Sequence, residues 1–182
     1  ASAVRFRRSP KGREEVDLLA RRTIALAEGR ITRVITTLEE LAGRGIDSCR
    51  PANLEALRQA TFSATPIKEI SVVAADGRTL CADFGSPFEQ RKAISSEPSA
   101  PDSNVLIEVV RVGDRPGHMV RIRRLSGGTS PGLAALIPVE QLIVQVSSQG
   151  GPLSSHARMT TRTGVLIAEA GVPPQGAESR LA

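Results

Sequence analysis

The two cysteines, Cys49 and Cys81, are the residues of this chain whose chemistry is easiest to name. In a reducing compartment, two cysteines so far apart in sequence are usually reduced core residues. In an oxidising compartment an even number of cysteines favours a disulfide. The residues alone leave both readings open. The pair is not a Cys-x-x-Cys motif, which argues against a thiol oxidoreductase.

Other site chemistries find little support. A zinc site would need Cys49, Cys81, His118 and His156, but none of these four has a close neighbour at ligand spacing. We interpret both histidines as turn or surface residues. No serine lies in a nucleophile elbow, and Gly127-Gly128 lacks the Lys-Ser/Thr of a phosphate loop. We therefore expect no catalytic residue, metal or cofactor, and no enzymatic activity in this chain.

Composition restricts the class of partner. The chain has 182 residues, enough for one real core, and a net charge of +5. Only 2% of its residues are aromatic, with no Trp or Tyr, so it lacks platforms on which bases could stack, and we expect no nucleic-acid partner. No apolar run reaches the roughly 18 residues of a membrane span. The chain opens at Ala1 without a signal-peptide pattern, which suggests a piece of a longer protein.

The N-terminal part predicts a long helix. Residues 1–13 are basic, and we interpret them as a disordered or membrane-proximal segment. Across residues 14–42 apolar side chains recur at three- and four-residue steps, as in an amphipathic helix. The apolar stripe either packs on the chain's own sheet or pairs with a second copy to form a homodimer through residues 14–42.

The cysteines lie on the elements that follow. Pro51 fits the first turn of a second helix, so Cys49 lies at its entry. Residues 67–74 and 79–84 read as two strands joined by an Asp76-Gly77 turn, which places Cys81 on the second strand.

The rest of the chain predicts mainly strands. Residues 85–104 read as a long loop. The further elements are strands at 105–112, 118–125 and 132–137, a short helix from Pro138 carrying Leu142, Ile143 and Val146, a hairpin of 157–161 with 165–168, and a tail or linker at 171–182. This order predicts an α+β sensor domain over residues 14–170, with a long N-terminal helix and a second helix packed on a mainly antiparallel, PAS/Cache-like sheet.

Three short segments resemble a known family. They are Cys49-Arg50-Pro51-Ala52-Asn53-Leu54, Ile67-Lys68-Glu69-Ile70 and Asp76-Gly77-Arg78-Thr79-Leu80-Cys81. In order and approximate spacing they are similar to the CSS-motif sensor domain of membrane-bound, EAL-type cyclic di-GMP phosphodiesterases, and Gly132 to Pro138 extends the likeness. The family usually has Cys-Ser-Ser after the turn, where this chain has Cys81-Ala82-Asp83.

The resemblance implies a periplasmic domain of an inner-membrane protein, lying between two transmembrane helices and followed by a cytoplasmic EAL domain. It implies that Cys49 and Cys81 form a disulfide that restrains the phosphodiesterase, and that reduction activates it. The implied partners are periplasmic thiol oxidants and reductants, the protein's own transmembrane helices and its EAL domain. The alternative is a Cache/PAS-type sensor that binds a small molecule on the concave face of its sheet, with a purely structural disulfide.

Overall fold

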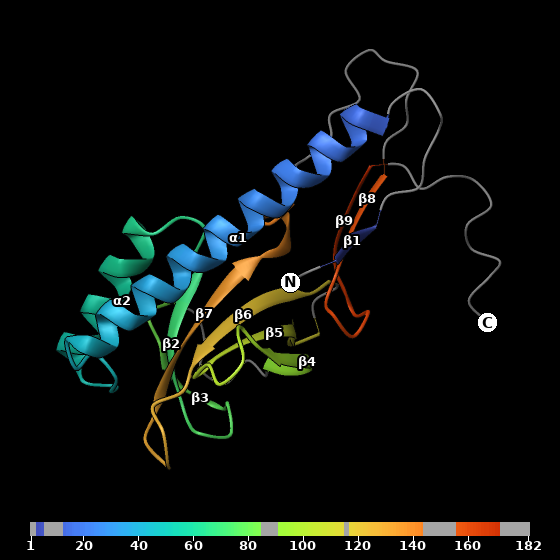
Figure 1. The fold of residues 1–182 in the computed structure, drawn as a ribbon. Coiled ribbons are helices and arrows are strands. Elements are labelled where there is room, and N and C mark those ends of the chain that lie inside the picture. Colours follow the sequence, from blue (N-terminus) through green and yellow to red (C-terminus); the bar gives the residue numbers. More distant parts are fainter. Residues whose placement is uncertain (1–2, 6–12, 85–90, 115–116, 144–155, 172–182) are drawn as a thin grey trace. The chain divides into compact units, whose positions relative to one another are not determined.

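The computed structural model describes residues 3–5, 13–84, 91–114, 117–143 and 156–171 (Figure 1). The chain divides into two compact units. One unit is Glu28–Val139, and the other combines Ala1–Ala27 with Glu140–Ala182. Both boundaries fall inside the range for which the sequence predicted one domain.

The unit Glu28–Val139 is built on a six-stranded antiparallel sheet in the order β3-β2-β7-β6-β5-β4. Its strands are β2 (Glu69–Val73), β3 (Thr79–Ala82), β4 (Arg91–Pro98), β5 (Val105–Val112), β6 (Met119–Arg124) and β7 (Gly132–Pro138). Strands β4 to β7 form a meander, and the β2–β3 hairpin pairs with its last strand. The predicted α+β class, with a long N-terminal helix, a second helix and a mainly antiparallel sheet, is confirmed.

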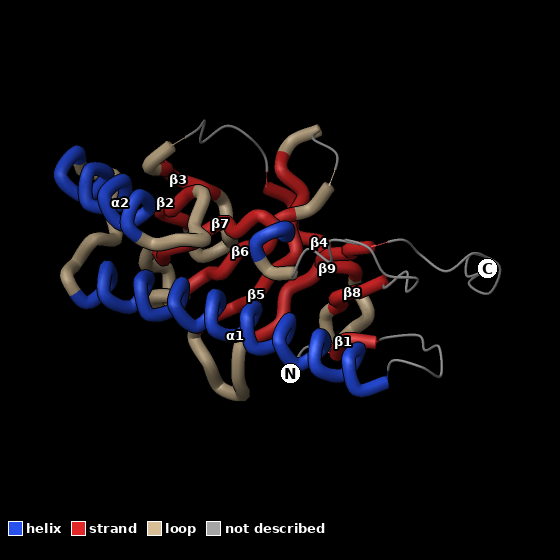
Figure 2. The backbone as a smooth tube through the Cα atoms, turned by 90° about the horizontal axis from the view of Figure 1, so that it is seen from above, coloured by secondary structure: helices blue, strands red, loops and turns tan. Residues whose placement is uncertain are grey.

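Two helices pack on the same side of this sheet, α1 (Arg13–Gly43), which enters the unit at Glu28, and α2 (Pro51–Ser63) (Figures 1 and 2). The side chains that join helices and sheet are almost wholly buried: Val34, Leu38 and Leu41 of α1, Leu57 of α2, and Ile70, Val72, Ile122, Ala135 and Ile137 of the sheet. The three- and four-residue spacing of the α1 side chains explains why this stretch is helical.

The connection between α1 and α2 begins with a glycine that ends the first helix. Gly45 has a φ of +71°, the left-handed conformation that commonly ends a helix. The Ile46 N–H donates to the Leu41 carbonyl at 3.0 Å, and the Gly45 N–H donates to the Ala42 carbonyl at 2.9 Å. These bonds satisfy carbonyls that the helix end leaves open, and they turn the chain toward Cys49.

The predicted loop at residues 85–104 is wrong in its middle, because Arg91–Pro98 forms the edge strand β4. Its sequence, RKAISSEP, is polar and ends in proline, and most of its residues are exposed. An edge strand with only one neighbour needs no apolar face, so it leaves no apolar alternation in the sequence. Residues 85–90 lie outside the described residues.

The predicted helix start at Pro138 is also wrong. Strand β7 runs through Pro138, and the backbone N–H that proline lacks is not needed at the end of the strand. Only a short 3₁₀ helix, Val139–Gln141, follows. Leu142 and Ile143 are buried as expected of core residues, and Val146 lies outside the described residues.

The second unit contains a three-stranded antiparallel sheet in the order β1-β8-β9. Its strands are β1 (Ala3–Arg5), β8 (His156–Thr160) and β9 (Leu166–Gly171). The predicted hairpin is therefore present, and part of the basic segment at 1–13 is a strand instead of being disordered. Residues 172–182 of the predicted tail lie outside the described residues. Within the described helices, none is both long and apolar enough to cross a membrane.

Candidate functional site

Cys49 and Cys81 are bonded to each other, as the family resemblance implied. Their Cα atoms lie 5.8 Å apart, within the range of ordinary disulfides. Cys49 is exposed and Cys81 is half-buried. Because both sulfurs are used in the bond, neither is available as the zinc ligand that a four-residue metal site would need.

On the helix side, the disulfide is attached directly before α2. Cys49 precedes Arg50, which is the N-cap residue, and Pro51 lies in the first turn as predicted. The Asn53 side-chain nitrogen donates to Ser48 Oγ at 2.9 Å and to the Gly45 carbonyl at 3.3 Å, which folds the connection back on the helix. The N-cap makes no side-chain hydrogen bond and the first turn has no acidic residue. The disulfide is therefore the strongest attachment at this helix end.

On the sheet side, Cys81 lies opposite Val72 in the β2–β3 hairpin. In the turn, Gly77 has a φ of +86°, and its N–H donates to the Ala74 carbonyl at 2.8 Å. The Ala74 N–H in turn donates to the Arg78 carbonyl at 2.8 Å. The Asp76-Gly77 turn predicted from the sequence is thus confirmed, and it fixes the strand that carries Cys81.

A buried ion cluster holds this turn in place. Arg121 donates to the Gly77 carbonyl at 3.0 Å, and Arg123 donates to the Ala75 carbonyl at 3.1 Å. Both guanidinium groups also bind Glu108, at 2.6 Å and 3.1 Å. Glu108 is 1% exposed and Arg121 is 3% exposed, so the interaction is shielded from solvent. Strands β5 and β6 therefore clamp the hairpin through its backbone.

This cluster lies on the sheet face turned away from the helices. Cys81 and its opposite residue Val72 face the helix side, since Cys81 bonds to Cys49, which precedes the N-cap of α2. Side chains alternate along a strand, so Glu69 of β2 faces the other way. Leu136, Arg121 and Glu108 lie in register with Glu69 across the sheet. On this face Glu69 also binds Arg91 of β4 at 2.7 Å.

Asp83 ties the other end of α2 to the same hairpin. It is 5% exposed, and its carboxylate accepts hydrogen bonds from Thr61 Oγ1 of α2, from the Ile70 N–H at 3.0 Å and from the Phe84 N–H at 2.7 Å. Burial raises the pKa of this carboxyl above its usual value of 3.8, and the hydrogen bonds offset only part of that effect. Asp83 occupies a position where the resembling family has serine.

Asp83 gives the stability of the fold a pH dependence of definite sign. With a raised pKa in the folded state, its contribution is complete below 3.8 and is lost as the pH rises through the folded-state value. We expect Asp83→Asn, which cannot ionise, to become more stable relative to wild type as the pH rises above 3.8. Urea unfolding at a series of pH values measures this. Exposed Asp114→Asn is the control, and a constant difference between Asp83→Asn and wild type contradicts the raised pKa.

An exposed aromatic pair flanks Asp83. Phe62 of α2 is 75% exposed, and its ring meets the Phe84 ring edge to face at 5.2 Å. The Arg58 guanidinium lies 5.7 Å from the Phe84 ring centre and also binds Glu55 at 2.6 Å. These contacts add a weak surface attachment between α2 and the segment after β3.

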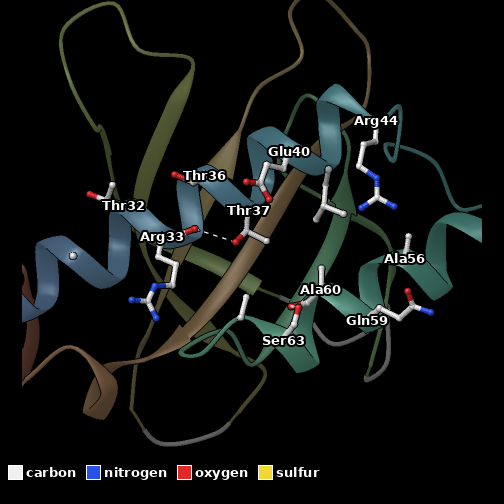
Figure 3. A pocket seen from close by; sticks show the side chains of 13 residues that line it. Thr32, Arg33, Thr36, Thr37, Glu40, Arg44, Ala56, Gln59, Ala60 and Ser63 are labelled. Atoms are coloured by element: carbon white, nitrogen blue, oxygen red, sulfur yellow. Dashed lines mark hydrogen bonds between the residues drawn. The ribbon is translucent and has the colours of Figure 1, made fainter.

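A groove of about 810 Å³ runs between α1 and α2 (Figure 3). Its lining is mostly small or polar: Gly29, Thr32, Arg33, Thr36, Thr37, Glu40, Leu41 and Arg44 of α1 and the residue following it, and Ala56, Gln59, Ala60, Ser63 and Ala64 from α2 and its C-terminal end. The predicted small-molecule alternative placed a pocket on the concave face of the sheet, whereas this groove lies between the helices.

Comparison of the chain with protein-family models, with curated proteins and with solved structures gave no match.

Sequence reasoning found the cysteines but missed the residues that hold them. Arg121 alternates with Val120 and Ile122, which reads as an outward-facing side chain, yet it is buried. Glu108 interrupts the apolar run from Val105 to Val110 in β5, and this charged residue was the available signal for a buried partner. His118 is partly exposed, as predicted, and the side chain of His156 lies outside the described residues.

Proposed function

We propose that this chain is the periplasmic redox-sensing domain of a transmembrane, EAL-type cyclic di-GMP phosphodiesterase, with no catalysis of its own. The observation that carries the proposal is the Cys49–Cys81 disulfide, which joins the entry of α2 to the edge strand β3. The motif resemblance around both cysteines supports the compartment and the family. Disulfides persist in the periplasm and are rare in the cytosol, in agreement with that placement.

The two ends of α2 are attached to the sheet by different kinds of bond. Reduction therefore affects one end of the helix and leaves the other in place. The N-terminal end is held by a covalent bond that a thiol can break, and the last turn is held by Thr61 and Asp83, which a thiol does not affect. The first turn has no side-chain cap to take over when the bond is broken. Reduction therefore releases the N-terminal end of α2 while its C-terminal end stays attached.

The β2–β3 hairpin that carries Cys81 stays in place when the disulfide is reduced. Arg121 and Arg123 keep their bonds to the hairpin turn whether or not the disulfide is present. The conformational response is therefore concentrated in residues 44–57, the connection and the first turns of α2. This segment follows α1 directly, so a shift in it reaches the long helix without passing through the sheet.

The disulfide is reduced by thiol–disulfide exchange with a dithiol protein of the thiol–disulfide oxidoreductase class, which supplies both electrons. Its thiolate attacks the sulfur of Cys49, the more exposed of the two residues, forming a mixed disulfide and releasing Cys81 as a thiolate that takes up a proton. The second thiol of the reductant then displaces Cys49. Two electrons and two protons pass to the chain, and the reductant leaves as a disulfide.

The intact membrane protein provides the decisive test. We expect Cys81→Ala to raise its phosphodiesterase output under oxidising conditions to the level of reduced wild type, and to remove any response to reductant. Alkylation followed by intact-mass measurement should show two thiols in wild type only after reduction. Equal output of wild type in both redox states, with the disulfide verified, would contradict the proposal.

The small-molecule alternative has weaker support. It requires convergent polar groups that are free to bind a ligand on the sheet. On the face turned away from the helices, Glu69 and Glu108 are already paired with arginines of neighbouring strands.

A further inference from the structure

The groove between α1 and α2 is shaped for another helix. Its α1 wall extends from Gly29 to Arg44, directly after the helix, a length of about 24 Å at 1.5 Å per residue. A Cβ placed on Gly29 meets no atom within 4 Å, so this end of the wall is open. On the other wall, Ala56 and Ala60 present only methyl groups. The small side chains on each wall leave room for the backbone of a further helix to approach between the larger, charged ones.

The charges on the α1 wall are unpaired within the described part of the chain. Arg33 and Glu40 are exposed, and neither side chain forms an ion pair with another described residue. Both line the groove, with Thr37 between them, and the Thr37 hydroxyl donates to the Arg33 carbonyl at 3.0 Å (Figure 3). Arg33 lies three positions before Thr36, and Glu40 lies three positions after Thr37. The wall therefore carries opposite charges placed symmetrically about its middle.

We propose that the occupant of this groove is a second copy of the chain, with the two α1 helices packed antiparallel about a two-fold axis between Thr36 and Thr37. This arrangement places Arg33 opposite the partner's Glu40, and the symmetry repeats the contact. It also places the smallest residue of the wall, Gly29, opposite the partner's Arg44, which is among the largest. A parallel pair would instead put Arg33 beside the partner's Arg33, and like charges repel.

The antiparallel pair closes on itself. Each copy offers one groove and inserts one helix segment, so both surfaces are used and the assembly stops at two copies. The sequence predicted either packing of α1 on its own sheet or pairing with a second copy. The structure shows that Val34 and Leu38 face the sheet, and the paired surface proposed here is the different face that carries Arg33, Thr36 and Glu40.

A second copy can occupy the groove whichever signal the domain senses, and the dimer requires neither the phosphodiesterase nor a reductant.

Charge reversal in the full chain separates the two orientations. We expect Arg33→Glu alone and Glu40→Arg alone each to raise the dissociation constant of the dimer by about tenfold, because each reversal turns two symmetric attractions into repulsions. The double variant restores both contacts and should return to within about threefold of wild type. Sedimentation equilibrium over a concentration series measures these constants.

Glu39→Arg is the matched control, since Glu39 is exposed on the same helix but does not line the groove. It should leave the dissociation constant unchanged. Circular dichroism confirms that each variant is folded. A wild-type chain that stays monomeric across the concentration series overturns the proposal. A double variant whose dissociation constant is raised by the product of the two single effects overturns it as well.

Discussion

Replacing both Cys49 and Cys81 with serine is expected to lower the free energy of unfolding by about 3.5 kcal/mol. The bond closes a loop with a sequence separation of 32, and the chain-closure estimate assigns this amount to the entropy that the unfolded chain regains. The unfolded variant should also expose more surface. We therefore expect a larger dependence of the unfolding free energy on urea concentration than in wild type.

Reductant provides the control for this measurement. Reduced wild type should unfold like the double variant, and the double variant should not respond to reductant at all. Native-state hydrogen exchange should then locate the change. The Leu54 N–H, which donates to the Arg50 carbonyl in the first turn of α2, should exchange faster without the disulfide, whereas amides of β6 should not. Equal acceleration in both places would contradict a local release of α2.

Glu108→Gln is expected to destabilise the fold by about 3–5 kcal/mol, the usual cost of removing one partner from a buried ion pair. Glu108 is 1% exposed and binds both Arg121 and Arg123. Its neutralisation leaves two guanidinium groups without a counter-charge on the buried face of β6. Urea unfolding of the oxidised protein measures the loss.

Glu55→Gln is the matched control, because it makes the same chemical change in a pair on the surface. Glu55 binds Arg58 at 2.6 Å, but about half of each side chain is exposed to solvent. We expect a change within about 0.5 kcal/mol. A loss at Glu108 as small as the loss at Glu55 would show that the buried cluster does not hold the β2–β3 turn.

The parts of the fold that the sequence predicted correctly are those specified by local patterns. Val34, Leu38 and Leu41 recur at helical spacing, and Pro51 and Asp76-Gly77 have backbone preferences that act within a few residues. The helices, the hairpin and the positions of both cysteines followed from these signals. The pairing of the cysteines did not, because spacing alone does not distinguish a disulfide from two thiols.

The remaining features depend on partners distant in sequence. Arg121 is buried only because Glu108, on the neighbouring strand, neutralises it. The carboxylate of Asp83 is held by Thr61, which lies 22 positions earlier in the chain. Strand β4 is defined by its pairing with β5, since its own polar sequence carries no alternation. In each case the sequence shows one partner without indicating the other.

The two outer strands of the six-stranded sheet also determine how the chain resists aggregation. An unpaired strand edge is a template on which another chain can add a strand. Here β4 carries the exposed charge of Lys92, a register shift between Ala93 and Ser95, and a terminal proline, and each of these interrupts such addition. At the opposite edge, β3 has only 4 residues. Extension of the sheet from copy to copy, the route to amyloid-like fibres, is therefore disfavoured at both edges.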